Sequence, residues 1–401
     1  MISSESIKYS LRNLNHRKGR SLLTILSIFM GIATIFIFVS FGLGLYTYID
    51  DLSSGTSADK ILIQAKGVGM PGLDDTFALT EEDLKIIENM PGIVESTPLS
   101  FKTAEVANQG EKIFTFVIGY DPESKLMFEL SNIGIDSGRW LKNNDKEKVL
   151  AGHNYQKKDL IFSKSFDLND KIELQGQDLR IVGFLESVGS PPDDAQLYVT
   201  QDQLDLLFPD NSYGWIIARV KDVEQIDNVM ERLEEKLRKH RGLEKGKEDF
   251  FIQSYQDLID NFSQALDIVI GFIILIALIS VVVSAVNTAN TMITSVLERI
   301  KEIGVMKAVG SSNAAVFNIF LFESLFLGFV AGVVGVLVGF GVTSFVGNLL
   351  ENMGWGFLAP FYHFYLFAGC IAFATITGAI SGVIPAFNAA KTNIVDALRY
   401  E

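Results

Sequence analysis

The chain of 401 residues is predicted to be a multi-span α-helical membrane protein, with four transmembrane helices and a large α+β extracytoplasmic domain between spans 1 and 2. Hydrophobic residues make up 48% of the chain, whereas charged residues make up 20%, too many for a protein that lies wholly in lipid. The apolar residues gather in four runs, each long enough for the roughly 20 residues of a spanning helix. The predicted spans cover residues 21–49, 263–290, 316–350 and 364–386.

The lysines and arginines orient these spans. The N-terminal segment 1–20, the loop 291–315 and the tail 387–401 together carry 10 basic and 5 acidic residues, whereas the short outer loop 351–363 has no lysine or arginine. All three basic segments fall on one side if every run spans the membrane, and basic loops tend to stay in the cytoplasm. We therefore expect a multi-pass protein of the cell (plasma or inner) membrane with cytoplasmic N- and C-termini.

The first span and the segment before it each allow two interpretations. A basic start followed by an apolar run also describes a signal peptide, but the run 21–49 is far longer than a signal-peptide core, so an uncleaved anchor is expected. Within residues 1–20, Ile7, Leu11 and Leu14 share one helical stripe. This pattern favours a short cytoplasmic amphipathic helix at the membrane surface over an ordinary tail.

Residues 50–262 are predicted to form the α+β extracytoplasmic domain. The order of its elements suggests one subdomain, residues 59–121 with 213–254, that is interrupted by another, residues 122–212. A helix is expected after Thr80, where an N-cap residue precedes an acidic first turn. The expected strands are Lys60–Ala65, Val94–Ala107, Lys112–Tyr120, Lys148–Ala151, Lys171–Leu174, Leu179–Leu185, Gln196–Val199, Trp215–Val220 and Phe250–Gln253.

The sequence offers no catalytic or metal-binding pattern, because it lacks G-x-S-x-G, H-E-x-x-H and C-x-x-C motifs. His153 and His240 have no patterned partner and are expected at the surface. The pairs Asp74-Asp75 and Asp193-Asp194 could serve calcium, but solvated loops are the favoured interpretation. Cys370 is the only cysteine, so no internal disulfide can form. The net charge of −14 argues against a nucleic-acid partner.

Spans 3 and 4 carry stripes of small residues at helical spacing, which let another helix approach closely. Glycine is also common in membrane helices generally, and the sequence leaves open whether such a contact lies within the chain or between two copies. The stripe residues are Gly328, Gly332, Gly335 and Gly339 in span 3, and Ala374, Gly378 and Gly382 in span 4.

Glu323 is an intramembrane acid that precedes the stripe of span 3. An ionisable group at this depth is costly, so it should face a polar interior, pair with a charge or be protonated. Because the spans contain no lysine or arginine, we expect no charge partner within the chain. Helix packing or placement near the cytoplasmic end is favoured over a proton relay, which would need several such groups.

The loop 291–315 contains a charged island, residues 298–311, between two apolar runs. Residues 298–307 of the island are predicted to form a short amphipathic helix. Its charged residues Glu298, Lys301 and Glu302 would face a partner, and its apolar residues Ile300, Ile303 and Met306 would face the membrane. The alternative is a merely solvated loop. On the other side of span 2, no proline or glycine interrupts a helix from Ser254 before Gly271, so a continuous lever is expected to enter the membrane from the domain.

Four motifs follow one another in the order and spacing of a known family. They are Tyr9-Ser10-Leu11-Arg12-Asn13-Leu14 with Arg20-Ser21-Leu22-Leu23-Thr24, Glu298-Arg299-Ile300-Lys301-Glu302-Ile303-Gly304 with Lys307-Ala308-Val309-Gly310-Ser311, Glu323-Ser324 before the glycine stripe, and Pro385-Ala386 with Asp396-Ala397-Leu398-Arg399-Tyr400-Glu401. In these motifs the chain resembles the permease subunits of MacB-type ABC systems, a group that includes the lipoprotein-releasing permeases and the cell-division permease FtsX. The domain matches by length and layout only.

The resemblance implies a permease dimer, of two identical chains or with a paralogue, that assembles with a separate ABC ATPase subunit. It also implies mechanotransmission to the outer domain, where an adaptor or substrate protein would bind. The sequence has no G-x-x-x-x-G-K-[ST] phosphate loop, so we expect a non-catalytic chain without a cofactor, with ATP and Mg on the partner ATPase. The residues assigned to ATPase coupling are Glu298, Arg299, Lys301, Glu302, Gly304, Lys307 and Gly310.

The sequence is compatible with several functions. Export or extraction of a substrate is favoured over FtsX-like outward signalling, because the domain is larger than the resemblance to FtsX would suggest. A proton-driven secondary transporter that uses Glu323 is a less favoured alternative. A membrane receptor or adhesin would leave the charged island and the stripes of small residues unexplained.

Overall fold

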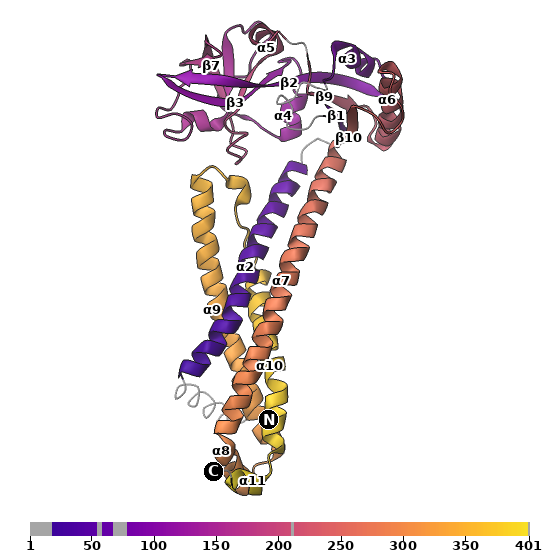
Figure 1. Ribbon diagram of the computed structural model, residues 1–401. Coiled ribbons are helices and arrows are strands. Elements are labelled where there is room, and N and C mark those ends of the chain that lie inside the picture. Colours follow the sequence, from indigo (N-terminus) through magenta and orange to yellow (C-terminus); the bar gives the residue numbers. More distant parts are fainter. Residues whose placement is uncertain (1–17, 54–57, 67–77, 210–211, 400–401) are drawn as a thin grey trace. The chain divides into compact units, whose positions relative to one another are not determined.

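The computed structural model describes residues 18–53, 58–66, 78–209 and 212–399 (Figure 1). The chain divides into two units. The helical unit comprises Met1–Leu45, Ala265–Leu349 and Ala359–Glu401, and the α+β domain comprises Tyr46–Gln264 with Leu350–Leu358. The predicted stripe of Ile7, Leu11 and Leu14 and the pair Asp74-Asp75 lie outside the described residues.

A mixed sheet forms the centre of the α+β domain. Its strands follow the order β10-β1-β9-β2-β3-β8-β5-β7-β4, and β6 pairs with β2 and β7 beside this path. The pairs β3·β8 and β5·β7 are parallel, and the other described pairs are antiparallel. The strands are β1 Lys60–Ala65, β2 Ile93–Asn108, β3 Glu111–Tyr120, β4 Ile135–Gly138, β5 Lys148–Ala151, β6 Lys171–Leu174, β7 Gln177–Leu185, β8 Leu197–Thr200, β9 Trp215–Val220 and β10 Phe250–Ser254.

The hairpin β2–β3 runs through both halves of this sheet (Figure 1). It closes at Gln109 and Gly110, whose φ angles of 50° and 91° are those of a tight type I′ turn. One hydrophobic core includes Ile61, Ile63, Ile87, Ile216, Val229, Leu233 and Phe250. The other includes Val106, Val117, Val149, Tyr155, Phe184, Leu197 and Leu204. The chain thus leaves the first core along β2 and β3, builds the second, and returns along β9.

Two helices cover the first core: α3 (Glu81–Glu88) and α6 (Ile226–His240), which lie together in Figure 1. Thr80 caps α3 as predicted, in a capping box with Asp83. Asp83 is only 1% exposed, and Arg241, at the end of α6, pairs with its carboxylate at 2.6 Å. Burial alone would raise the pKa of Asp83, but the hydrogen bonds from Arg241 and Thr80 lower it below its ordinary value.

The structure corrects two predictions about polar residues of this domain. Asp194 is not in a solvated loop, because it is 2% exposed and accepts hydrogen bonds from the Ser187 hydroxyl at 2.6 Å and the Val188 N–H at 2.8 Å. His240 is exposed as expected, whereas His153 is half-buried. Among the described residues, no group of three or more acids, histidines or cysteines could hold a metal ion.

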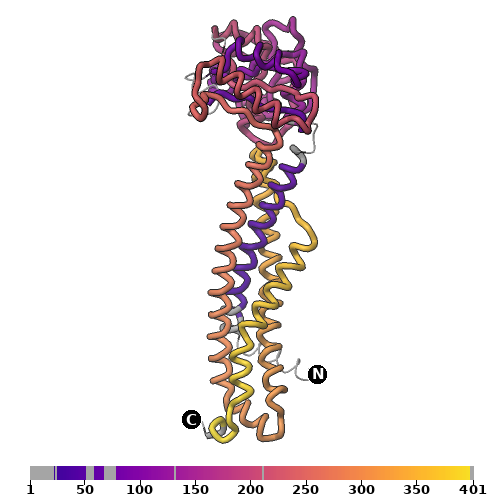
Figure 2. The backbone as a smooth tube through the Cα atoms, turned by 90° about the vertical axis from the view of Figure 1, so that its right-hand side faces the viewer, coloured from indigo at the N-terminus to yellow at the C-terminus, as the bar shows by residue number. Residues whose placement is uncertain are grey.

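Four long apolar helices meet the length and hydropathy expected of membrane spans among the described residues. They run beside one another in both views (Figures 1 and 2). They are α2 (Lys18–Ser53), α7 (Tyr255–Glu298), α9 (Asn313–Asn352) and α10 (Phe364–Lys391). The helix predicted to run unbroken from Ser254 into span 2 is α7, which continues for 44 residues.

The glycine stripes pack helices of the same chain against each other. A Cβ atom added at Gly328 would lie 2.6 Å from the Ala374 carbonyl oxygen of α10, and one added at Gly378 would lie 2.8 Å from the Cα of Gly328. Gly332 and Gly382 face the same α9–α10 contact. The stripe then turns to α2: a Cβ at Gly335 would lie 3.0 Å from Ile32, and one at Gly339 would lie 3.1 Å from Phe36. These glycines therefore make contacts within one chain, a point that the sequence alone left undecided between the chain itself and a second copy.

The turn between α9 and α10 belongs to the α+β domain. It contains the short helix η3 (Gly356–Leu358), and the Phe357 N–H donates a hydrogen bond to the Gly189 carbonyl at 3.2 Å. The ring of Phe357 also lies 5.8 Å from that of Tyr48. Gly189 has a φ of +74°, and a Cβ there would lie 2.7 Å from the Phe357 nitrogen, so glycine permits this close approach.

Candidate coupling site after the second span

The charged island folds into α8 (Ile300–Ala308), which follows α7 after a single residue, Arg299. One face of α8 is buried: Ile303 is 0% exposed and packs with Val316, Phe320 and residues of α10. Lys301 and Glu302 lie on the exposed face. The predicted amphipathic helix is therefore present, but over Ile300–Ala308 and not from residue 298, and its apolar face packs on α9 and α10 where contact with the membrane was predicted.

Arg299 pairs with Glu323, so the prediction that Glu323 has no charge partner within the chain is wrong. The Arg299 Nη1 atom lies 3.0 Å from the Glu323 Oε2 atom, and the two side chains are 4% and 8% exposed. The guanidinium also lies 4.9 Å from the centre of the Phe320 ring and 3.2 Å from the Glu302 carboxylate. The sequence argument considered cations only within the spans, whereas Arg299 reaches α9 from the junction of α7 and α8.

Lys307 joins α8 to the end of α10. Its ammonium donates hydrogen bonds to the carbonyl oxygens of Ala390, at 2.9 Å, and Thr392, at 2.7 Å. These carbonyls lie at the C-terminus of a helix, where main-chain acceptors lack helical partners and the helix dipole favours a positive charge. The helix α11 (Ile394–Arg399), which follows α10, also packs on α8, and Figure 2 shows both at the same end of the helical unit.

Gly310 ends α8 with a backbone conformation that favours glycine. Its φ is +105°, its N–H donates to the Lys307 carbonyl at 3.1 Å, and the Ser311 N–H donates to the Met306 carbonyl at 3.0 Å. These two hydrogen bonds form a Schellman motif, in which the residue after the C-cap adopts the left-handed conformation. Gly310 therefore shapes the turn into α9.

The seven residues assigned to coupling thus fall into two groups. Glu298, Lys301 and Glu302 are exposed, and Glu302 also pairs with Arg299. The other four have structural roles: Arg299 and Lys307 hold α8 in place, Gly304 lies on its buried face, and Gly310 ends it. Sequence reasoning missed two exposed apolar residues on α8 and its C-cap, Val305 at 53% and Val309 at 86% exposure. Their spacing of four residues on a short helix was the signal that could have found them. We call Glu298, Lys301, Glu302, Val305 and Val309 the α8 surface.

Four apolar helices, a large domain inserted after the first and a short helix after the second give the chain the architecture of a multi-span membrane protein. Residues 21–236 match the MacB-like periplasmic core domain, and residues 274–394 match the FtsX-like permease C-terminal domain. The chain is 31% identical over 399 residues to an uncharacterized ABC transporter permease of Methanocaldococcus jannaschii, and 98% of each chain is covered. The chain belongs to the MacB-type family of ABC transporter permeases.

Two further comparisons concern MacB itself. The chain is 26% identical over 408 residues to the macrolide export ATP-binding/permease protein MacB of Neisseria gonorrhoeae, an alignment that covers 98% of this chain and 60% of that protein. It is also similar to the crystal structure of the periplasmic region of MacB from Actinobacillus actinomycetemcomitans, with 15% identity, a TM-score of 0.42 and coverage of 54% of this chain and 98% of that one. The family and the fold class expected from the sequence are confirmed, and the α+β domain is the extracytoplasmic domain.

Proposed function

We propose that the chain is the permease subunit of an ABC-type export or mechanotransmission complex. It relays ATP-driven motion of a separate ATPase subunit to its extracytoplasmic domain, which moves or extracts a substrate. ATP and Mg bind to the ATPase, and this chain contributes no catalytic group. The subunit lies in the cell membrane as a dimer, with its termini and α8 in the cytoplasm, where the basic segments are retained.

The observation that carries the proposal is that α8 is exposed on one face and fastened on the other. Arg299 links it covalently to α7 and by an ion pair to Glu323 of α9, and Lys307 links it to the last carbonyls of α10. A force on the α8 surface therefore reaches three of the long apolar helices. Its mixture of two valines with charges of both signs suits a groove on a soluble protein.

The helix α7 supplies a direct connection to the extracytoplasmic domain. It follows β10 without a break, and Ser254 and Asp257 form a capping box at its start, with the Asp257 N–H donating to the Ser254 hydroxyl at 2.9 Å and the Ser254 N–H donating to the Asp257 carboxylate at 3.2 Å. The strand β10 pairs with β1 at the edge of the sheet. A displacement along α7 would thus act on an edge strand of the first core.

The ion pair with Arg299 weighs against the proton-driven alternative. A proton carrier must exchange its proton with water, whereas the Glu323 side chain is only 8% exposed and its carboxylate is engaged by the Arg299 guanidinium at 3.0 Å. Between export and outward signalling, the size of the extracytoplasmic domain and the similarity to a macrolide export protein support export. A neighbouring gene for an adaptor, as opposed to one for a cell-wall hydrolase, would support the same choice.

Charge reversal on the α8 surface tests the proposal. The variant Glu298→Lys/Glu302→Lys should lose copurification with the partner ATPase and lose permease-stimulated ATP hydrolysis, because both positions are exposed and would repel a surface matched to the wild type. The control Glu224→Lys/Glu231→Lys changes two exposed acids of the extracytoplasmic domain by the same amount. Copurification and stimulated hydrolysis at wild-type levels in the α8 variant would refute the role of this helix.

A further inference from the structure

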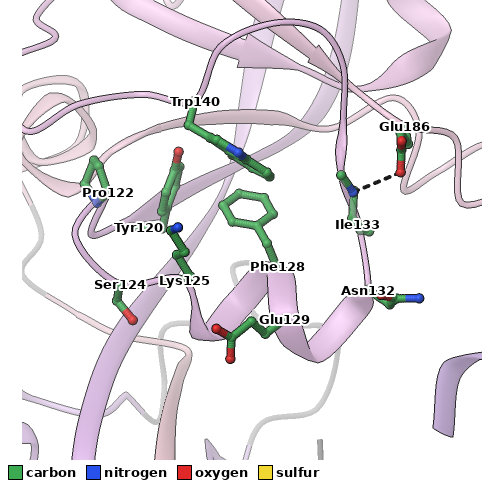
Figure 3. A pocket seen from close by; sticks show the side chains of 11 residues that line it. Tyr120, Pro122, Ser124, Lys125, Phe128, Glu129, Asn132, Ile133, Trp140 and Glu186 are labelled. Carbon is green, nitrogen blue, oxygen red and sulfur yellow. Dashed lines mark hydrogen bonds between the residues drawn. The ribbon is translucent and has the colours of Figure 1, made fainter. Parts of the chain in front are cut away.

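A cavity of about 490 Å³ opens in the extracytoplasmic domain, far along the chain from the α8 surface. It lies beside α4 (Leu126–Ser131), where the chain leaves β3 and where β7 ends (Figure 3). Its volume is in the range of sites for small organic ligands. The lining residues are Tyr120, Pro122, Ser124, Lys125, Phe128, Glu129, Asn132, Ile133, Gly134, Trp140 and Glu186.

Three aromatic rings form one wall of the cavity. The ring of Phe128 lies 4.2 Å from that of Trp140 and 5.1 Å from that of Tyr120, edge to face, and Figure 3 shows the three rings gathered together. Tyr120 is 2% and Phe128 6% exposed, and Trp140 is half-buried. The wall therefore has a buried, packed backing and one large ring that remains partly accessible, which is an apolar platform for a flat group.

The segment that carries Trp140 is held in place before any ligand arrives. Arg139 donates one hydrogen bond to the Trp140 carbonyl at 2.8 Å and pairs with Asp145 at 2.6 Å. Asp145 also accepts the Lys142 N–H at 3.0 Å. The pKa of Asp145 lies well below its ordinary value. Burial alone would raise that pKa, but the hydrogen bonds from Arg139 and Lys148 together lower it by more. A preformed wall of this kind loses little conformational entropy on binding.

The carboxylates of the cavity have unequal surroundings. Glu129 pairs with Arg219 of β9 and lies 3.5 Å from the Lys60 ammonium, so neighbouring cations balance its charge. Glu186 is exposed and lies across the cavity from the rings, with its carboxylate accepting the Gly134 N–H at 3.1 Å (Figure 3). Lys125, on the rim, is the basic residue among the lining residues. The surrounding domain favours a cation too, because residues 50–262 include 40 acidic and 24 basic residues.

We propose that this cavity binds an amphipathic organic cation. Its flat apolar group lies against Trp140 and Phe128, where the faces of the rings also attract positive charge, and its ammonium group lies toward Glu186. All of the lining residues belong to this chain, so binding can be measured without the partner ATPase. Because α4 carries both Phe128 and Glu129, and Glu129 reaches Arg219 in β9, a bound ligand would contact an element that ties the second core to the first.

A pair of ligands with the same ring and opposite charge tests the proposal directly. Calorimetric titration of the full chain in phosphatidylcholine nanodiscs would compare 1-naphthylmethylammonium with 1-naphthylacetate, with empty nanodiscs subtracted. The ammonium compound should bind saturably, one per chain, and at least about tenfold more tightly than the carboxylate. The reason is that the Glu186 carboxylate attracts the ammonium group and repels the carboxylate group of the other ligand.

Four variants assign the binding to this cavity. Glu186→Gln should weaken binding of the ammonium compound several-fold, and Lys125→Gln should strengthen it, because each removes one charge from the lining. Trp140→Leu should weaken it about tenfold through loss of the ring face. Glu224→Gln, an exposed acid on the same domain, should leave it unchanged. Equal or tighter binding of the carboxylate, affinities in Glu186→Gln and Lys125→Gln that match the wild type, or no saturable binding of the ammonium compound would each overturn the proposal.

Discussion

Replacing Arg299 with methionine should destabilise the helical unit by about 3–5 kcal/mol, because it leaves the Glu323 carboxylate buried without its partner. The magnitude follows from the surroundings of the pair. The side chains of Arg299 and Glu323 are 4% and 8% exposed, and the Phe320 ring covers the guanidinium, so water cannot take over the lost contact. A solvent-exposed ion pair would contribute only about 0–1 kcal/mol.

A double-mutant cycle separates the pair from its parts. Glu323→Met should cost a similar amount, whereas the double variant Arg299→Met/Glu323→Met should recover most of the stability, with a coupling of at least about 2 kcal/mol between the two positions. Reversible unfolding in mixed micelles with increasing sodium dodecyl sulfate measures these differences. The control Lys301→Met removes an exposed cation of the same helix and should stay within about 0.5 kcal/mol of the wild type. Additive effects of the two substitutions, or single variants as stable as the control, would refute the reasoning.

Three further predictions concern packing, turns and pH. Gly378→Leu should disrupt the α9–α10 contact and lower stability in the same micelle assay by at least about 3 kcal/mol, since even a Cβ there would lie 2.7 Å from the Ser324 carbonyl oxygen, whereas Gly369→Leu in the same helix, with open space around it, should be tolerated. Gly310→Ala should cost about 1 kcal/mol, because alanine at a φ of +105° is strained although nothing lies within 4 Å of its Cβ. The lowered pKa of Asp83 stabilises the fold above the ordinary aspartate pKa of about 3.9, and this stability is lost as the pH falls through the lower value in the folded chain. Asp83→Asn should therefore reduce thermal stability at pH 7 and flatten its decline below about pH 4.

Sequence patterns predicted the structure correctly where an element follows a local periodicity of apolar or small residues. The strand expected over Val94–Ala107 is β2 over Ile93–Asn108, and the helix expected from Ser254 is α7. The glycines of span 3 repeat at helical spacing, and they do face other helices. In each case the spacing of residues along a single helix or strand determines which face packs, so residues close together in the sequence are enough to predict the element.

Contacts between residues far apart in the sequence could not be predicted from local patterns. Arg299 and Glu323 are 24 positions apart, and their pairing depends on the turn between α7 and α8. Lys307 meets carbonyls of Ala390 and Thr392, which carry no side-chain signal at all. Three of the seven residues assigned to coupling from the motif, Arg299, Lys307 and Gly310, therefore have contacts or conformations that hold the helix, which a motif cannot distinguish from contacts with a partner.

The cavity beside α4 shows the same limit. Tyr120, Phe128 and Trp140 come from the end of a strand, a six-residue helix and a loop, so no period connects them. Glu186 joins them only because β7 pairs with β4 and ends nearby. A site assembled from four separate elements becomes visible only once the sheet order is known.

The central claim is that a push on the α8 surface changes the extracytoplasmic domain. Hydrogen–deuterium exchange of the assembled complex, with and without ATP and vanadate, measures this directly in the peptides that cover β10 and the start of α7. We predict that trapping with vanadate alters their exchange in the wild type and not in Val305→Asp/Val309→Asp, where two exposed valines of the α8 surface become acids. An identical response in that variant, or no response in the wild-type complex while it hydrolyses ATP, would contradict the claim.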